Sequence, residues 1–443
     1  MQKRQMALNC FLFGMGHHES AWRYKDTDPR QMTDIKYFQK LAVMAEEAKF
    51  DSLFVADGLS GGASFSNYFE PLTFLSSLAT VTKRIGLIGT VSTTYSEPYN
   101  VARYFASLDH ISKGRIGWNI VTTGSNDAAY NFNHDFHLEH AKRYERAKEF
   151  LEVTTGLWDS WEDDALLFDK AAGVLADKER IREIDHVGEF FKVKGPLNIP
   201  RPLQGYPVLV QAGSSKSGKD FAAQYAEVIY TMQSCIEDAR KFYSDVKSGL
   251  AKFHRSPDHL KVLPGVAVII GETEAEAREK EQELNELINP ELGLHRLSSL
   301  FGVDMFTYPL DGPLPELPDA EEINGQRTKY KIFVDIAKRE NLTIRQLLHR
   351  TAAGRGDFTI VGTPVQVADQ LEEWFTTGAC DGFNIMPPNF PGGLEEFISR
   401  VIPELQRRGL FRTEYTGSTL REHLGLPRPN NSLTNVTKLA VNG

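Results

Sequence analysis

The sequence predicts an α/β protein in which eight parallel strands close into a (β/α)8 barrel, or TIM barrel, with insertions. Short apolar runs alternate with longer helical patterns along almost the whole chain, as in βα units that build a parallel sheet. Eight such runs are present, which is the number that a (β/α)8 barrel needs. An open doubly wound sheet is the alternative, but no GxGxxG sequence follows the first run.

The predicted strands are rich in apolar, β-branched and aromatic residues and are bounded by turn residues. In chain order they span residues 6–13, 52–56, 85–90, 116–120, 207–212, 228–231, 262–270 and 382–386. Three of the helices between them begin after a polar residue or a proline that favours a helix start. These helices are 35–48 after Thr33-Asp34, 72–82 after Glu70-Pro71, and 218–225 after Lys216-Ser217.

Two long segments interrupt the pattern within what we predict to be a single domain over residues 1–443. Residues 168–202 are predicted to form a β-hairpin excursion with its turn at 185–188. Residues 289–355 are rich in proline, glycine and acidic residues and then become helical from Lys329 to Arg350. An insertion of this size beside the last strand is predicted to be either a lid or substrate wall, or a surface for oligomerisation.

Composition and charge argue against several classes of protein. Of the 443 residues, 41% are hydrophobic and 25% are charged, which is typical of a folded globular chain. The net charge is −9 and the basic residues are scattered, so we expect neither nucleic acid nor a membrane surface as a partner. No apolar stretch approaches the roughly 18 residues of a membrane span.

The start of the chain and its cysteines indicate a cytoplasmic protein. The start, MQKRQMALNCFLFGMG, is predicted to be a first buried strand rather than a signal peptide, because its apolar run is short and no cleavage site follows. The three cysteines lie far apart without a CxxC motif, so we expect reduced thiols and no metal site.

Polar residues follow most of the predicted strands, at the face of a (β/α)8 barrel that carries the active site. They are His17-His18 with Trp22-Arg23, Asp57, Ser92 to Tyr95, Asn119 with Thr122-Thr123, Gly213 to Ser215, Gln233-Ser234, and Asn384. This set contains hydroxyls, amides and imidazoles, but no carboxylate pair, metal-binding motif or nucleophile elbow. Such a barrel mouth suits an enzyme whose cofactor supplies the reactive chemistry.

Two segments point to an anionic ligand at this mouth. In VLVQAGSSKSGKDFAAQYA, a strand leads through Ser214 and Ser215 into a helix, whose N-terminus favours an anion such as a phosphate. Ordinary helix capping by serine is the alternative. In HLEHAKRYERAKEF, His140 and Tyr144 stand one helical turn apart on one face, so both could reach a common ligand. A solvated helix with one inward aromatic residue is the alternative there.

Several long motifs of the chain also occur together in one known family. They include FVADGL, TVSTTYSEPYNVARYFASLDHISKGRIGWNIVTT, LEHAKRYERAKEFLEV, PVLVQAGSSKSG and GFNIMPPNFPGGLEEFISRVIPELQRRGLFRTEY. Through these motifs the chain resembles the bacterial-luciferase-like flavin monooxygenases. Within them it is similar to the nitrilotriacetate, dibenzothiophene-sulfone and long-chain-alkane monooxygenase branch. The resemblance implies a luciferase-like barrel that binds FMNH2 from a separate NAD(P)H:flavin reductase and uses O2 to oxygenate a small organic substrate.

The resemblance also implies which residues bind the cofactor. Asp57 and Thr94 would lie beside the isoalloxazine ring, and the ribityl and phosphate end would be held by His140, Tyr144, Ser214 and Ser215. It implies no catalytic residue, and whether His17 or His18 faces the substrate stays open. Aromatic residues that could keep water from the reacting face, or simply belong to the core, are Phe13, Phe65, Phe69, Tyr95 and Tyr230.

The substrate is predicted only by class. It is either an organosulfur compound, such as a cysteine S-conjugate that is cleaved at its C–S bond, or an aminopolycarboxylate. Arg23 and Arg355 are candidate partners for a substrate carboxylate. The alternative functions are a deazaflavin (F420)-dependent oxidoreductase of the same superfamily and a non-catalytic flavin-binding protein. The resemblance further suggests a homo-oligomer.

Overall fold

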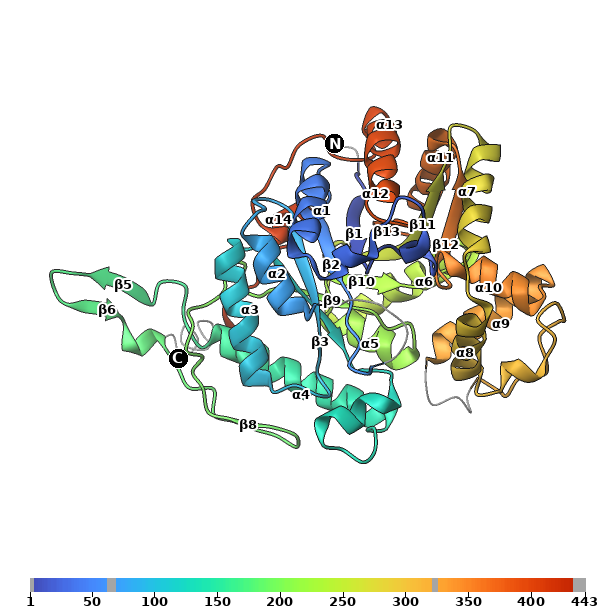
Figure 1. Cartoon of the computed structure of the whole chain (residues 1–443). Coiled ribbons are helices and arrows are strands. Elements are labelled where there is room, and N and C mark those ends of the chain that lie inside the picture. Colours follow the sequence, from blue (N-terminus) through green and yellow to red (C-terminus); the bar gives the residue numbers. More distant parts are fainter. Residues whose placement is uncertain (1–3, 62–68, 321–325, 433–443) are drawn as a thin grey trace.

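The computed structural model describes residues 4–61, 69–320 and 326–432, and its centre is a closed ring of eight parallel strands (Figure 1). Around the ring these are β1 (Ala7–Leu12), β2 (Ser52–Val55), β3 (Gly86–Ser92), β4 (Ile116–Val121), β9 (Val208–Gln211), β10 (Val228–Thr231), β11 (Lys261–Ile270) and β13 (Gly382–Met386). β10 pairs with β11, β11 with β13, and β13 with β1, so each ring strand has two neighbours. The predicted barrel and all eight predicted strands are confirmed, and the open-sheet alternative is wrong.

A ninth strand, β12 (Phe358–Gly362), is missing from the prediction. It pairs with the second half of β11, from Val266 opposite Phe358 to Ile270 opposite Gly362. Three of its five residues, including Phe358, are only partly buried. A strand that is not buried on both faces carries a weaker apolar signal than the ring strands do, which is why the sequence does not reveal it.

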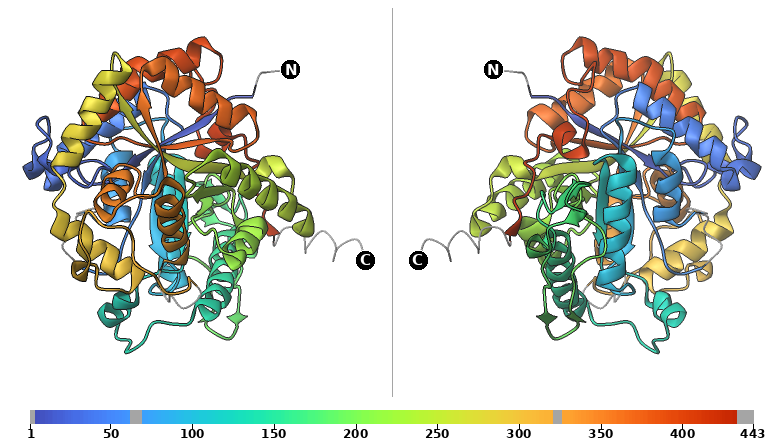
Figure 2. Two further views of the ribbon diagram at one scale, coloured as in Figure 1. Left: turned by 90° about the vertical axis from the view of Figure 1, so that its right-hand side faces the viewer. Right: turned by 90° about the vertical axis from the view of Figure 1, so that its left-hand side faces the viewer.

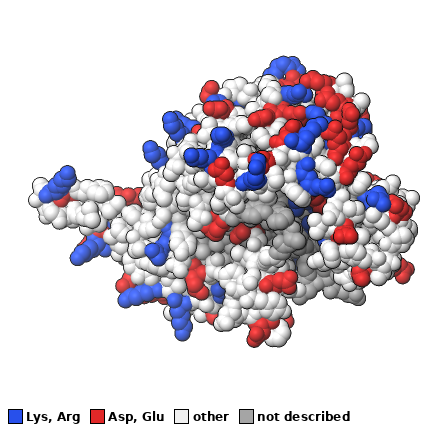
Figure 3. Space-filling model, in the orientation of Figure 1, with Lys and Arg blue, Asp and Glu red and all other residues white. Residues whose placement is uncertain are grey.

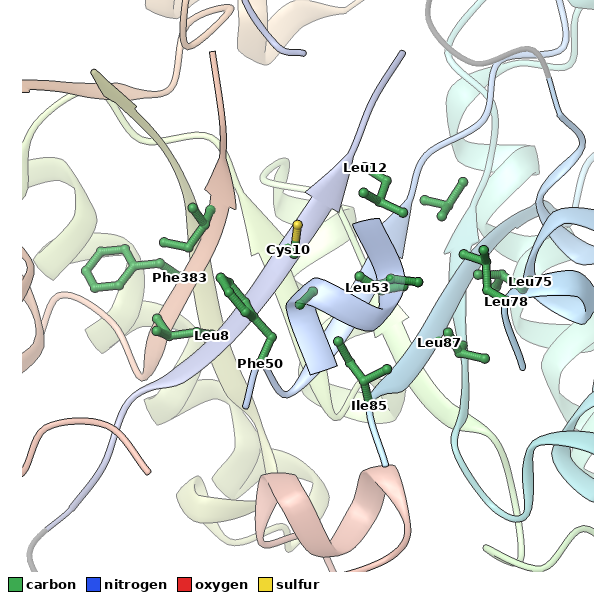
Figure 4. Packing of buried hydrophobic residues seen from close by; sticks show 14 of the residues in the cluster. Leu8, Cys10, Leu12, Phe50, Leu53, Leu75, Leu78, Ile85, Leu87 and Phe383 are labelled. Atoms are coloured by element: carbon green, nitrogen blue, oxygen red, sulfur yellow. The ribbon is translucent and has the colours of Figure 1, made fainter. Parts of the chain in front are cut away.

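The ring strands are buried on both faces, so their residues alternate between two hydrophobic cores. On β1, Leu8, Cys10 and Leu12 belong to the core between the strands and the helices, where they lie near Leu53 of β2 and Phe383 of β13 (Figure 4). Their neighbours in sequence, including Phe11, point into the barrel and belong to a second core. This double burial explains why the strands read as nearly continuous apolar runs.

Helices surround the ring (Figure 2). They are α1 (Ile35–Glu47), α2 (Pro71–Ala79), α3 (Pro98–Ser112), α4 (His140–Asp159), α5 (Lys216–Tyr225), α6 (Ile236–Gly249), α7 (Glu274–Glu286), α11 (Pro364–Thr376), α12 (Gly392–Glu396) and α13 (Ile402–Arg407). Asp34 caps α1 and Glu70 caps α2, as their sequence predicts. The start predicted for α5 is wrong by two residues, because Ser215 accepts the N–H of Gly218 and starts the helix at Lys216.

A short helix, α14 (Leu420–Leu424), closes the floor of the barrel. Leu420 and Leu424 belong to the core inside the ring. Cβ atoms on Gly86 and Gly117 would lie 2.4 and 3.3 Å from Leu420, so the starts of β3 and β4 pack directly on this helix. The mouth is therefore left as the open end of the barrel.

Two antiparallel hairpins extend from the barrel after α4. β5 (Leu166–Asp169) pairs with β6 (Val174–Ala176), and this hairpin projects away from the rest of the molecule (Figure 1). β7 (His186–Val187) pairs with β8 (Lys192–Val193). The turn predicted at 185–188 is wrong, because the N–H of Gly188 donates to the carbonyl of Phe191 and places the turn at 188–191.

A helical insertion of α8 (Pro290–Phe301), α9 (Arg327–Glu340) and α10 (Ile344–Ala352) lies beside the mouth (Figure 1). It has its own core, which includes Phe301, Phe333 and Leu347. The single helical stretch predicted from Lys329 to Arg350 is wrong. Asn341 adopts a left-handed conformation that ends α9, and Thr343 starts α10 with a capping box.

Charged side chains of both signs are mixed over the face shown in Figure 3. In the part of the chain that the structure describes, no helix is long and apolar enough to cross a membrane. In the same residues, no three His, Cys, Asp or Glu side chains gather in a way that could hold a metal ion.

Candidate active site

Four hydroxyl residues from the ends of β3 and β4 form a network at the barrel mouth. Ser92 Oγ lies 2.6 Å from Thr123 Oγ1 and accepts the N–H of Thr94 at 3.2 Å. The buried hydroxyl of Thr94 donates to the carbonyl of Thr122 at 2.9 Å. Pairing of Ser92 with Val121 brings the two loops together. The predicted mouth residues Thr94, Thr122 and Thr123 are therefore neighbours whose hydroxyls are held in place by hydrogen bonds.

Tyr144 connects α4 to the turn before α5. Its hydroxyl interacts with the side chains of Ser215 and Thr122, and burial raises its pKa. Its ring lies 5.0 Å from that of His140, so these two predicted residues do share one face of α4. Although His140 is largely exposed, burial of its ring and the nearby charges of Arg143 and Arg327 lower its pKa.

The turn between β9 and α5 is tight and rich in hydrogen-bond donors. A Cβ atom on Gly213 would lie 2.3 Å from Gln211 Nε2 and 2.9 Å from the Tyr144 hydroxyl, so a larger residue would push these two groups aside. Ser214 Oγ lies 3.2 Å from Thr231 Oγ1 on β10. Ser215 caps α5, which confirms the capping alternative, but its hydroxyl keeps a proton that it can donate. The turn thus has the donor set that an anion needs at a helix N-terminus.

Asp57 follows β2 and faces the mouth from the next strand. Its side chain accepts the N–H of Gly58 at 2.8 Å and remains reachable by solvent. The surrounding walls remove part of its hydration and raise its pKa, and the charge of Glu70 adds to this effect. β2 pairs with β3, so Asp57 and Thr94 follow adjacent strands.

His137 is a mouth residue that the sequence did not single out. Its Nε2 lies 3.1 Å from the carbonyl of Thr123, so this nitrogen must carry the proton. Its Nδ1 then accepts the phenol proton of Tyr95 at 2.6 Å. The Tyr95 ring also stacks on Phe132 at 4.8 Å. His137 comes from the irregular segment between Phe132 and α4, which has no strand or helix periodicity to reveal where its side chains point.

The structure separates the two histidines after β1. His17 is buried between the rings of Phe11 and Phe13, at 4.6 and 5.1 Å, and burial lowers its pKa to about 3. His18 points towards α7, where Nε2 lies 3.2 Å from Asn285, and burial lowers its pKa to about 4. Both imidazoles are therefore neutral near neutral pH, and His17 lies on the mouth side.

Two predicted mouth residues lie inside the barrel instead. Asn119 donates to Thr90 Oγ1 at 2.8 Å, and Asn384 accepts from Asn9 at 3.1 Å while donating to the carbonyl of Leu263 at 2.9 Å. They occupy inward positions within β4 and β13 rather than the loops that follow. Their placement at the mouth is therefore wrong, and they form a polar layer below it.

The two arginines predicted as carboxylate partners lie in different surroundings. Arg355 lies over the ring of Phe13 at 4.5 Å, whereas Arg23 is exposed and donates to the carbonyl of Leu287 at the end of α7. Tyr230 packs with Phe11 inside the ring. Phe65 lies outside the described residues.

The fold and the mouth define a (β/α)8-barrel enzyme with hydroxyl groups and a helix N-terminus at the carboxyl ends of its strands. The chain belongs to the luciferase-like monooxygenase family, whose model matches residues 13–380. The family predicted from the sequence motifs, with its flavin-dependent monooxygenase activity, is thus confirmed.

Similar proteins cover the chain almost completely. It is 50% identical over 435 residues to N-acetyl-S-(2-succino)cysteine monooxygenase of Bacillus subtilis (strain 168), covering 97% of this chain and 98% of the relative. It is 49% identical to nitrilotriacetate monooxygenase component A of Aminobacter aminovorans, with the same two coverages. The solved structure of EDTA monooxygenase (EmoA) from Chelativorans sp. BNC1 matches with a TM-score of 0.78 and 36% identity, covering 96% of this chain and 99% of that one.

Proposed function

We propose that this protein is the oxygenase of a two-component system. It takes FMNH2 from a separate NAD(P)H:flavin reductase and uses O2 to oxygenate a small organic substrate. The observation that carries this proposal is the 50% identity, over 97% of the chain, to a monooxygenase of a cysteine S-conjugate. The name "component A" of a second relative supports a separate partner component.

The donors at the α4–α5 side fit the phosphate and ribityl end of FMN. Ser214 and Ser215 lie at a helix N-terminus, and Tyr144 with His140 faces them from α4. Gln211 Oε1 is buried and has no hydrogen-bond partner among the described residues, as expected of a site completed by a ligand. Asp57 and Thr94, from adjacent strands, would lie beside the flavin ring. When bound, FMN supplies a ring that reacts with dioxygen.

The chain's own residues would orient the cofactor, exclude water from the mouth and hold protons at fixed positions. The network around Ser92 and Thr94 fixes the hydroxyls on one side of the ring site. His137 holds the Tyr95 phenol proton in a fixed direction at Tyr95 Oη. The aromatic cluster of Phe11, Phe13 and Tyr230 keeps water from the inner side of the mouth.

For the substrate we propose a cysteine S-conjugate, with cleavage of its C–S bond, or an aminopolycarboxylate. The two relatives named above act on one compound of each kind. Both compounds are flexible and carry several carboxylates, so a single site could accept either class.

We also propose that the protein is a cytoplasmic homo-oligomer and that residues 1–443 form one domain. The hairpin of β5 and β6 supports oligomer formation, because it projects from the barrel and exposes apolar side chains. Phe168 is 64% exposed and Leu175 is 66% exposed. Exposed apolar surface of this kind is typical of protein contacts.

The test combines the protein with FMN, NADH, a flavin reductase and 18O2. N-acetyl-S-(2-succino)cysteine and nitrilotriacetate are supplied as substrates, and products are analysed by mass spectrometry. We expect one 18O atom in a product of at least one substrate, and none when the reductase is left out. Turnover with reduced F420 and without oxygen incorporation would instead support the deazaflavin alternative. FMN binding without any turnover would support the non-catalytic one.

A further inference from the structure

Three cations meet where the helical insertion faces the barrel mouth. Arg296 on α8 and Lys329 on α9 both lie over the ring of Phe333, with Cζ at 5.8 Å and Nζ at 5.5 Å from its centre. Arg355 lies over the ring of Phe13 at 4.5 Å. Besides burial, the charge of Arg355 lowers the pKa of Arg296, and the charges of Arg296 and Arg355 lower the pKa of Lys329. The three cations therefore form one electrostatic cluster.

Only one of these cations has a carboxylate partner among the described residues. Arg296 forms an ion pair with Glu19. Arg355 donates from Nε to the carbonyl of His17 at 2.9 Å. In residues 4–61, 69–320 and 326–432, no carboxylate oxygen lies within 4 Å of the Arg355 guanidinium or the Lys329 ammonium.

The nearby carboxylate, Asp357, is engaged through one oxygen only: its buried Oδ1 has no hydrogen-bond partner among the described residues, and its charge acts on Lys329. It accepts the hydroxyl proton of Tyr230 at 2.7 Å, and burial raises its pKa to about 7. Burial also lowers the pKa of Lys329 to about 7 and that of Arg355 to about 10. Partly buried cations without counter-charges are costly in a folded protein, and a bound anion removes that cost.

The cluster is continuous with the proposed cofactor site. Ser214 lies 3.2 Å from Thr231, and Thr231 accepts from Gln233 at 2.8 Å. Tyr230, the residue before Thr231, donates to Asp357. β10 therefore links the β9–α5 turn, through Thr231, to Asp357, whose charge acts on Lys329.

We propose that Lys329 and Arg355, with Arg296 beside them, bind the carboxylates of the substrate and select for compounds that carry at least two. The proposal rests on the proposed function and assigns its substrate class to these residues. A flexible ammonium and a planar guanidinium suit two separate carboxylates of one small molecule. The helical insertion then serves as the substrate wall rather than only as an oligomer surface.

The experiment measures binding rather than turnover. Nitrilotriacetate and propane-1,2,3-tricarboxylate are titrated by calorimetry into the full-length protein, with and without oxidised FMN. Trimethyl propane-1,2,3-tricarboxylate has the same carbon skeleton but no charge. The variants are Lys329→Met and Arg355→Met, and Lys338→Met on the exposed face of α9 is the matched control. FMN affinity is measured for every variant by fluorescence.

We expect each site variant to lose at least about tenfold in tricarboxylate affinity, because one charge-assisted contact disappears. The control and all FMN affinities should stay unchanged, and the trimethyl ester should not bind. The proposal is wrong if the tricarboxylates bind the wild type neither with nor without FMN, if the variants bind them as the wild type does, or if the ester binds equally well. A fall in FMN affinity alone would also overturn it, by assigning the cations to the cofactor phosphate. Failure of oxygenation with intact tricarboxylate binding would count against the proposed function only.

Discussion

The two sides of the barrel mouth hold their polar groups in different ways. On the α4–α5 side, the hydroxyls of Tyr144 and Ser215 contact each other in a tight turn around Gly213. On the insertion side, Lys329 and Arg355 have no carboxylate partner among the described residues. On the first side most polar groups bond to one another, although Gln211 Oε1 lacks a partner among the described residues, while the second side carries charge that a ligand would neutralise. Mutations on the two sides should therefore differ in their effects on stability and on binding.

The largest effect is expected from comparing Arg355 with a fully hydrogen-bonded arginine at the floor end of the barrel. The buried guanidinium of Arg115, at the start of β4, donates to the carbonyls of Ser112, Thr82, Ile85 and Ala79 and to the Thr82 hydroxyl. Arg115→Met should lower the free energy of unfolding by about 3 kcal/mol or more, because these acceptors lose charge-assisted hydrogen bonds. Arg355→Met should change it by less than about 1 kcal/mol, because the lost hydrogen bond to the His17 carbonyl is offset by the relieved desolvation cost of a charge without a carboxylate partner.

Urea denaturation of the flavin-free protein, followed by far-UV circular dichroism, checks both values. Equal destabilisation by the two variants would show that Arg355 is a structural cation, and the contrast between the two sides would fail.

The second prediction concerns the turn before α5. Gly213→Ala should lower FMN affinity by about tenfold, because the new methyl group displaces the Tyr144 hydroxyl and costs its hydrogen bonds. Stability should change little, since the atoms in the way are the ends of the Gln211 and Tyr144 side chains. Fluorescence titration with FMN measures the effect. Gly124→Ala is the control, because its Cβ would meet only Gln326 Cγ, at 3.9 Å.

The third prediction is a pH dependence that only the insertion side should show. The pKa of Lys329 is about 7, so its ammonium loses its proton as pH rises through neutrality. Asp357, with a pKa of about 7, gains negative charge over the same range. Both changes weaken anion binding, and we expect tricarboxylate affinity to fall by about tenfold between pH 6.5 and 8.5.

In Lys329→Met this slope should be roughly halved, because only Asp357 still titrates in this range. Calorimetry at several pH values measures it. An unchanged slope in the variant would place the titrating group elsewhere.

The smallest effect is expected for Tyr144→Phe. The variant keeps the ring contact with His140 but loses the hydroxyl that reaches Ser215 and Thr122. FMN affinity should fall by about fivefold, the value of one ordinary hydrogen bond. Tricarboxylate affinity should not change, and a parallel loss of both affinities would show that the two sides are not independent.

The α4–α5 side could be predicted from sequence because its signals are local. A strand, Gly213, two serines and a helix follow one another directly, and His140 and Tyr144 are separated by one helical turn. The ring strands were equally visible, since both of their faces are buried. β12 was not, because it is only partly buried.

The insertion side could not be predicted in the same way. Its residues come from α8, α9 and the segment before β12, and only the fold brings them together. Arg23 and Arg355 looked equivalent in the sequence, but Arg23 is bound to the end of α7 and Arg355 faces the mouth. Lys329 carried no signal, since a lysine on a helix is usually solvated.

The position of α14 sets an order for folding. Leu420 and Leu424 fill the base of the barrel, yet they follow β13 in the chain. In a nascent chain the ring strands can pair before α14 has docked. The leucine and isoleucine side chains below the polar layer are then still exposed to water. The protein should therefore reach its final resistance to proteolysis only after residues 420–426 have left the ribosome.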